Sequence, residues 1–168
     1  MINTGLLTKD KTVFLIVDYQ ERLMPFIHQN EMMIANANKL IKGAEVLGVS
    51  LLVTEQYPKG LGHTHPAIEL PANQEIIEKI SFSCMLCGEV ESRLKNLGIK
   101  SLVIAGIEAH VCVLKTALDA VAAGYEVHIA ADAISSRTAE NKSLAIERLR
   151  QAGVFIASTE MLLFQLMD

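Results

Sequence analysis

The stretch TVFLIVD at residues 12–18 decides the fold. Its first six residues are apolar or β-branched, without the polar alternation of a half-exposed strand. Such a run is typical of a strand buried on both faces, which occurs in parallel sheets covered by helices on each side. Asp18 then places a carboxylate at the carboxyl end of this strand, where open parallel sheets bind their ligands.

Short apolar runs alternate with helical patterns along the rest of the chain. Further strands are predicted at residues 50–53, 75–80, 101–105, 126–130 and 154–157. Helices are predicted at residues 31–47, 89–97, 111–123 and 138–151, with a last one capped by Ser158 or Thr159 and ending at Leu166. This alternation predicts an α/β fold with a parallel sheet and helices on both faces. Residues 55–73 form the longest irregular stretch, and loops of this length are usually functional or mobile.

The bulk composition narrows the class of protein. A chain of 168 residues fits one domain spanning residues 1–168, and a hydrophobic content of 51% supports a substantial core. The net charge of −4 comes from dispersed charges, so we expect no nucleic-acid partner. The sequence shows neither a signal peptide nor an apolar run of membrane-spanning length. We therefore expect a cytoplasmic protein that does not bind membranes, with three free cysteine thiols.

Three side chains with useful chemistry fall at one edge of the predicted sheet. Asp18 ends the first strand, Lys79 lies at the end of the third, and Cys112 follows the fourth, in the first turn of the next helix. Unpaired backbone N–H groups and the helix dipole stabilise a thiolate there, and a nearby ammonium is expected to lower the thiol pKa further. A carboxylate is suited to take the thiol proton and to return it to a leaving group.

Each of these residues also has a simpler explanation. Free cysteines are often inert core residues, an aspartate after a strand often caps the next turn, and most lysines are solvated. Convergence of Asp18, Lys79 and Cys112 at one sheet edge favours the catalytic interpretation.

The other motifs do not indicate a metal or cofactor. Cys84 and Cys87 form a single C-x2-C pair, without the second pair that a zinc site requires, and we interpret them as helix-start and core residues. His63 and His65 lie near Glu55 but lack an evident third firm ligand. No glycine-rich nucleotide-binding pattern is present, and Gly106 is interpreted as a tight turn. We expect no metal and no cofactor.

Several segments, taken in order, resemble one family. They are FLIVDYQ at residues 14–20, KISFS at 79–83, GIEAHVCV at 106–113, TALDA at 116–120, GY at 124–125, DA at 132–133 and SS at 135–136. These segments resemble the isochorismatase-like cysteine hydrolase superfamily, which includes nicotinamidases and N-carbamoylsarcosine amidases, over residues 12–167. TEQYPKGLG at residues 54–62 and SSR at 135–137 look most like the short isochorismatase-domain-containing proteins.

The resemblance implies a three-layer α/β/α fold with a six-stranded parallel sheet of order 3-2-1-4-5-6. It implies a catalytic triad of Asp18, Lys79 and Cys112, and a non-proline cis peptide between Ile107 and Glu108. The backbone N–H groups of Glu108 and Cys112 would form the oxyanion hole. Members commonly assemble into dimers, tetramers or larger rings, so a homo-oligomer is expected.

The chain departs from its relatives in informative places. Nicotinamidases carry an Asp-x-His metal segment after the second strand, where this chain has EQY at residues 55–57. Isochorismatases proper typically lack the nucleophilic cysteine, so the presence of Cys112 argues for acyl chemistry. We therefore expect hydrolysis of a small amide or ureide through a covalent thioester. The pocket is expected to be shaped by Gln20, Glu55, Tyr57, Phe82 and His110.

Two alternatives remain open. One is vinyl-ether hydrolysis of isochorismate, which predicts that Asp18 is required and Cys112 is not. The other is an oligomeric binding or redox-responsive protein that kept the site but lost useful catalysis.

Overall fold

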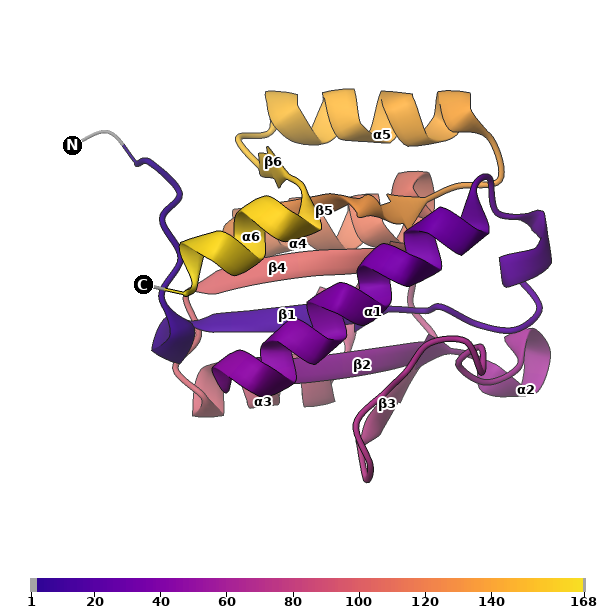
Figure 1. Cartoon of the computed structure of the whole chain (residues 1–168), viewed down its shortest axis with the longest axis horizontal. Coiled ribbons are helices and arrows are strands. Elements are labelled where there is room, and N and C mark those ends of the chain that lie inside the picture. Colours follow the sequence, from indigo (N-terminus) through magenta and orange to yellow (C-terminus); the bar gives the residue numbers. More distant parts are fainter. Residues whose placement is uncertain (1–2, 168) are drawn as a thin grey trace.

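Strands and helices alternate along the chain in the computed structural model, which describes residues 3–167 (Figure 1). The strands are β1 (Thr12–Val17), β2 (Ser50–Gln56), β3 (Ile76–Lys79), β4 (Ser101–Ile107), β5 (Glu126–Ser135) and β6 (Phe155–Ala157). The α-helices are α1 (Asn30–Leu47), α2 (Pro58–Leu61), α3 (Gly88–Asn96), α4 (Leu114–Ala122), α5 (Ala139–Gln151) and α6 (Thr159–Gln165). Short 3₁₀ turns are η1 (Lys9–Lys11), η2 (Met24–Phe26) and η3 (Cys84–Leu86), and a π-helical turn, η4 (Ala109–Val113), precedes α4.

All six strands are parallel and lie in the order β3-β2-β1-β4-β5-β6, which confirms the predicted sheet. Figure 1 shows α1 and α6 on the near face, with α3 and α4 behind the sheet. The chain adds strands in one direction from β1 to β3 and in the other from β4 to β6. The carboxyl ends of β1 and β4 therefore flank the switch point of the topology, where such sheets bind ligands.

The run at residues 12–17 is buried throughout because β1 separates two apolar cores. Phe14 and Ile16 belong to the core beneath α1 and α6. Val13, Leu15 and Val17 point the other way, into the core beneath α3, α4 and α5. Successive strand residues face opposite sides of a sheet, so a strand in this position must be apolar at every residue.

Several element boundaries differ from those predicted. The second, fourth and fifth strands run on to Gln56, Ile107 and Ser135, beyond the predicted ends at residues 53, 105 and 130. The added residues of β2 pair with β3, and those of β4 and β5 pair with each other, at the ligand-binding edge, which an apolar pattern does not reveal. The stretch at residues 55–73 is also not wholly irregular, since it includes the end of β2 and the short helix α2.

Gly106 lies inside β4 and not in a tight turn, so that prediction was wrong. Its φ angle is +145°, and a Cβ atom at this residue would lie only 2.2 Å from the backbone oxygen of Val17. The glycine therefore allows β4 to approach β1 closely at the edge that carries the candidate site.

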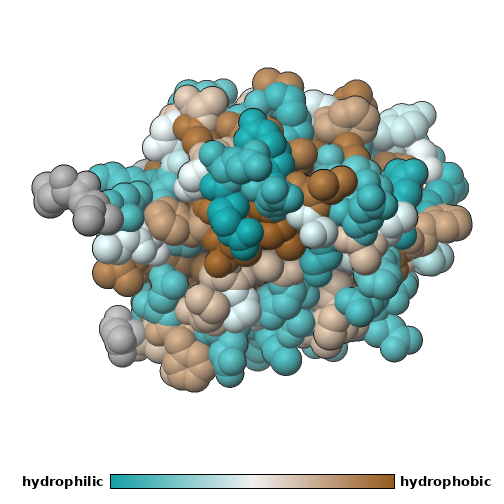
Figure 2. Space-filling view, turned by 90° about the horizontal axis from the view of Figure 1, so that it is seen from above, coloured by the Kyte–Doolittle hydropathy of each residue, from teal (hydrophilic) through white to brown (hydrophobic). Residues whose placement is uncertain are grey.

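The outer surface mixes polar and apolar side chains. Figure 2 looks down on the face covered by α5, where hydrophilic residues cross the middle and apolar residues show between them. Within residues 3–167, no helix combines the length and the apolar character needed to cross a membrane.

Candidate active site

Asp18 and Lys79 form a buried ion pair at the carboxyl edge of the sheet. The Nζ of Lys79 donates to Oδ2 of Asp18 at 2.6 Å, and the two side chains are 1% and 0% exposed. Asp18 has a φ angle of +53°, a conformation uncommon outside glycine, directly after the last residue of β1. The hydroxyl of Thr54 donates to the other carboxylate oxygen at 2.8 Å. The carboxylate is thus fixed from two sides.

The ammonium of Lys79 makes two further hydrogen bonds, to the backbone oxygens of Ser81 at 3.0 Å and Phe82 at 3.2 Å. Burial works to lower the pKa of Lys79, but the adjacent Asp18 carboxylate together with Cys84 and Cys112 outweighs it, and the pKa is raised. Lys79 therefore stays charged and neutralises the buried carboxylate.

Cys112 lies in η4, the π-helical turn after β4, where a regular α-helical first turn was predicted. The residue is 4% exposed. Its thiol donates to Oε1 of Gln56 at 3.4 Å. Burial raises the pKa of the Cys112 thiol to about 12, with Asp18 acting in the same direction and Lys79 opposing it. The expected lowering of this pKa is thus reversed, because burial and a neighbouring carboxylate outweigh the ammonium.

The turn between β4 and Cys112 is anchored to the end of β5. The peptide bond between Ile107 and Glu108 is cis. Arg137 donates from Nη2 to Oε1 of Glu108 at 2.6 Å and from Nε to Oε2 at 3.1 Å. Although burial works to raise the pKa of Glu108, the hydrogen bonds from Arg137 lower it overall. Nearby, Nδ1 of His110 lies 2.9 Å from Oγ of Ser136.

Gln20 and Glu55, predicted to shape the pocket, use their polar groups to fix the loops around it. The side-chain amide of Gln20 donates to the backbone oxygens of Gln56 and Gly62 at 2.9 and 2.7 Å, and its Oε1 accepts from the N–H of Gln56 at 2.8 Å. Glu55 accepts from the N–H and hydroxyl of Thr64 at 2.6 and 2.8 Å. The Gln20 contacts hold the segment after β1 against the end of β2 and the loop that follows, and the Glu55 contacts hold that loop against the end of β2.

Tyr57 and Phe82 lie at the outer side of the site, with 51% and 56% of their surface exposed. Tyr57 lines a cavity of about 760 Å³ together with Lys79, Ile80 and Leu86. The backbone of Phe82 holds Lys79, as described above, while its ring projects outward. His110 is half-buried and contacts Ser136, the residue after β5.

The sequence patterns did not reveal two side chains that contact the candidate triad: Thr54, which donates to Asp18, and Gln56, which accepts from Cys112. Thr54 and Gln56 lie at the end of β2, on residues that the predicted strand did not include. The hydroxyl of Thr54 also lies 3.7 Å from the sulfur of Cys84. Cys84 is a core residue, as predicted, and burial raises its pKa to about 11. Side chains of a strand point alternately to its two faces, so Thr54 and Gln56 lie on the same face of β2. This alternation is the sequence signal that could have identified both residues as part of the site.

Residues 3–167 contain no group of three His, Cys, Asp or Glu side chains placed to hold a metal ion. The Nδ1 of His63 lies 3.1 Å from Oε2 of Glu55, and this contact raises the pKa of His63. The Glu55 carboxylate therefore already has hydrogen-bond partners within its own loop, in His63 and Thr64.

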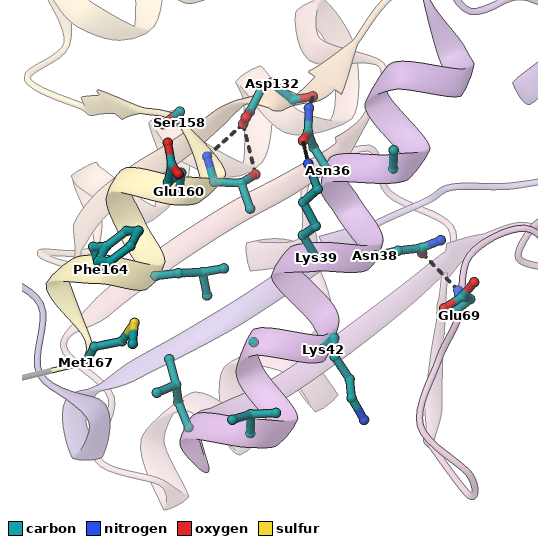
Figure 3. Close-up of a pocket in the computed structure, with 16 residues that line it drawn as sticks. Asn36, Asn38, Lys39, Lys42, Glu69, Asp132, Ser158, Glu160, Phe164 and Met167 are labelled. Atoms are coloured by element: carbon teal, nitrogen blue, oxygen red, sulfur yellow. Dashed lines mark hydrogen bonds between the residues drawn. The ribbon is translucent and has the colours of Figure 1, made fainter.

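A separate cavity of about 870 Å³ lies between α1 and α6, on the near face of the sheet (Figure 3). At one end, Oδ1 of Asp132 accepts from the N–H and hydroxyl of Thr159 at 2.8 and 2.9 Å. Val46 and Phe164 supply apolar walls. None of Asp18, Lys79 and Cys112 lines this cavity, so we place the candidate chemistry elsewhere.

A six-stranded parallel sheet with helices on both faces, and with an acid, a lysine and a cysteine at its carboxyl edge, defines a three-layer α/β protein with a candidate site at that edge. The isochorismatase domain family matches residues 12–161. Isochorismatase domain-containing protein 1 of Danio rerio is 41% identical over 163 residues, covering 96% of this chain and 57% of that protein. Isochorismatase domain-containing protein 2 of the same fish is 40% identical over 169 residues, covering 100% of this chain and 85% of that protein. The chain belongs to the isochorismatase family.

The chain spans less than three fifths of the length of the first of these relatives. Among solved structures, the MAR1 ribonuclease of Caenorhabditis elegans is 35% identical with a TM-score of 0.89, covering 95% of this chain and 83% of that one. YcaC of Escherichia coli, described as an octameric hydrolase of unknown specificity, is 21% identical with a TM-score of 0.86, covering 99% and 84%. The likeness to YcaC shows the fold alone.

Proposed function

We propose that this chain is a cysteine-dependent hydrolase of small amide or ureide substrates that works through a covalent thioester. The observation that carries the proposal is the buried 2.6 Å ion pair of Lys79 and Asp18 at the carboxyl edge of the sheet that also carries the Cys112 thiol. Membership of the isochorismatase family supports hydrolysis as the reaction class.

In the acylation step, Asp18 takes the thiol proton as the sulfur of Cys112 attacks the substrate carbonyl carbon. A thiol with a pKa near 12 is protonated at neutral pH, so proton removal must accompany attack. Lys79 stabilises the negative charge as it moves from carboxylate to sulfur. The backbone N–H groups of Glu108 and Cys112 would receive the carbonyl oxygen as it becomes negative.

Collapse of the tetrahedral intermediate breaks the C–N bond, and Asp18 returns its proton to the leaving amine. Asp18 then removes a proton from water, which attacks the thioester. The products are a carboxylic acid and an amine, and the thiol of Cys112 is restored. The thiol of Cys112 donates a hydrogen bond to Oε1 of Gln56 in the resting site, so this hydrogen bond must break before Asp18 can take the thiol proton.

The test is a screen of small amides and ureides for ammonia release, followed by variants. Cys112→Ala is expected to abolish turnover and to keep the circular dichroism spectrum of the wild type. Lys79→Met should lower turnover strongly, whereas Lys95→Met on the exposed side of α3 serves as its matched control. A rapidly quenched reaction should carry the acyl group on Cys112 by mass spectrometry. Unchanged turnover in Cys112→Ala would contradict the assignment of Cys112 as the nucleophile.

Other outcomes identify the rival functions. Vinyl-ether hydrolysis would survive Cys112→Ala and be lost in Asp18→Ala. RNA cleavage, suggested by the name of the C. elegans relative, is disfavoured by the net charge of −4, and its detection in Cys112→Ala would replace the proposal. A chain that neither hydrolyses any of these substrates nor forms an acyl-enzyme would favour an oligomeric binding or redox-responsive protein that kept the site but lost useful catalysis. We also propose that the chain assembles as a homo-oligomer.

A further inference from the structure

The side-chain amide of Gln56, the last residue of β2, connects the candidate nucleophile to the segment after β3. Its Oε1 accepts from the thiol of Cys112 at 3.4 Å. Its Nε2 donates to the backbone oxygen of Ile80 at 3.3 Å. One carboxamide therefore joins the ends of two strands to η4, the turn that carries the thiol.

The contact with Ile80 fixes which end of this carboxamide faces the sulfur. A carboxamide has a donor end and an acceptor end, and a backbone carbonyl oxygen only accepts. Nε2 must therefore face Ile80, which leaves Oε1 to face Cys112. An acceptor beside the sulfur stabilises the neutral thiol and disfavours the thiolate. Gln56 thus acts in the same direction as burial and Asp18, which raise the pKa of the Cys112 thiol.

The carboxylate of Asp18 is occupied by other donors in the resting site. Its Oδ2 accepts from Nζ of Lys79 at 2.6 Å, and its Oδ1 accepts from the hydroxyl of Thr54 at 2.8 Å. The thiol of Cys112 meanwhile directs its hydrogen bond to Gln56. The proposed base and the proposed nucleophile are therefore both held by third groups, and the thiol must turn before it can give its proton to Asp18.

This turn requires only the side chain of Gln56 to move, because its backbone is held on both sides. The N–H of Gln56 donates to Oε1 of Gln20 at 2.8 Å, and its backbone oxygen accepts from Nε2 of Gln20 at 2.9 Å. Gln56 is also paired with Lys79 in the register of β2 and β3. The outer contact of the carboxamide is with Ile80, which is 78% exposed. The side chain can therefore be released from the solvent side without opening the sheet.

We propose that Gln56 is a positioning residue that keeps Cys112 protonated and turned away from Asp18 until its carboxamide rotates away. This inference rests on the proposed function and names how the nucleophile is held inactive between turnovers. Electrophiles and oxidants that reach the resting protein meet a neutral thiol. Rotation of the Gln56 side chain then frees the thiol proton for Asp18.

Two variants of Gln56 with opposite expected effects test this role. Gln56→Met keeps the length of the side chain and removes the carbonyl, whereas Gln56→Glu keeps an acceptor and adds a negative charge. Alkylation of Cys112 by iodoacetamide is followed by mass spectrometry at neutral pH without substrate. Gln56→Met should raise the rate by roughly 2- to 10-fold, the effect of losing one ordinary hydrogen bond. Gln56→Glu should lower the rate below that of the wild type, because the added charge disfavours the thiolate.

The S–H stretching band in the infrared reports the hydrogen bond of the thiol directly. The Cys112 band is assigned by its absence from Cys112→Ala. It should move to higher wavenumber in Gln56→Met, because the thiol loses its acceptor, and Gln56→Glu should restore the hydrogen-bonded position. Gln151→Met, which replaces an exposed glutamine of α5, is the matched control and should leave the band and the alkylation rate unchanged.

An unchanged S–H band in Gln56→Met, or alkylation rates that rise in both variants, would overturn the role of Gln56. A loop loosened by substitution would speed alkylation in both variants, so the opposite signs exclude a merely structural effect. Circular dichroism confirms that each variant folds. If Gln56→Met does not fold, faster alkylation in Gln56→Glu rejects the role and slower alkylation supports it.

These measurements use no substrate, so they separate this inference from the proposed function. The expected band shift and rates would support the role of Gln56 even if Cys112→Ala kept full turnover and the thioester mechanism failed. An acyl group found on Cys112, together with an unchanged band in Gln56→Met, would confirm the thioester and reject the role of Gln56.

Discussion

At the scale of single residues, Asp18 and Lys79 carry opposite charges where water reaches neither side chain. Removing ions from water is costly, and the 2.6 Å contact offsets that cost only while both partners are present. Hydrogen bonds from Thr54 and to the backbone oxygen of Ser81 satisfy further polar atoms of the pair. Replacing both residues by neutral ones should therefore destabilise the fold less than replacing only one of them.

Lys79→Met should lower the free energy of unfolding by about 3–5 kcal/mol, because it leaves the Asp18 carboxylate buried without a counter-charge. Urea denaturation measures the change. Adding Asp18→Asn to Lys79→Met should recover part of the loss, since the uncompensated charge is removed. A double variant less stable than Lys79→Met alone would contradict this account.

The same pair predicts how stability depends on pH. The pKa of Lys79 is raised above its ordinary value of 10.5, so its contribution is fully present below that pH. The contribution is lost as the pH rises through the raised, folded-state value. The stability difference between wild type and Lys79→Met should therefore shrink in strongly alkaline solution. Urea titrations at neutral and alkaline pH test this, and a difference that grows with pH would show the opposite sign.

Alkylation of Cys112 tests the charge balance around the thiol. With a pKa near 12, Cys112 should react slowly with iodoacetamide at neutral pH and faster as the pH rises. Asp18→Asn removes a negative charge that raises this pKa, so it should speed the reaction. Mass spectrometry follows Cys112 beside Cys84, which is also buried. A Cys112 that reacts at the same rate with and without the Asp18 charge would refute this arrangement.

At the scale of elements, the close approach of β4 to β1 depends on Gly106. Gly106→Ala should destabilise the fold by about 3 kcal/mol or more, because the new Cβ meets the backbone oxygen of Val17 in a conformation that disfavours side chains. Gly124→Ala is the matched control: its φ angle is +89°, yet nothing lies within 4 Å of a Cβ there. That variant should lose only the backbone cost of about 1–2 kcal/mol. Thermal unfolding compares the two, and equal losses would show that crowding at Val17 is unimportant.

Patterns of apolar residues predict elements well where packing alone decides them. In α1, apolar residues at helical spacing cover the sheet, and Gly48, with a φ angle of +70°, ends the helix as expected. Cys112 shows where such patterns fail, because apolar spacing does not distinguish the π-helical turn η4 from the start of α4. The ends of β2 and β5 were missed for a related reason, since their polar residues are held by strand pairing and by hydrogen bonds at the ligand-binding edge.

At the scale of the whole molecule, apolar side chains gather beside β3, which is an edge strand of the sheet. Tyr57, Ile80, Phe82 and Leu86 are all more than half exposed. Contiguous exposed apolar surface of this kind commonly marks an interface. We expect light scattering to give a mass that is a multiple of 18.4 kDa, and Ile80→Glu to reduce it.

Leu144→Glu on α5 is the control for that experiment, because Leu144 is likewise exposed but lies on another element. A wild-type mass of 18.4 kDa would rule out the oligomer. If the wild type is an oligomer and Ile80→Glu leaves its mass unchanged, the interface does not include the apolar surface beside β3.

The sequence by itself determined the parallel α/β fold, the family and three chemically capable residues at one sheet edge. It did so because burial on both faces forces β1 to be apolar, and because parallel strands carry the residues after them to a common edge. Only the tertiary structure decided the electrostatics. The raised pKa of Cys112, the contact with Gln56 and the pairing of Glu108 with Arg137 all join segments far apart in the chain. Their strength depends on burial and distance, which a linear pattern does not contain.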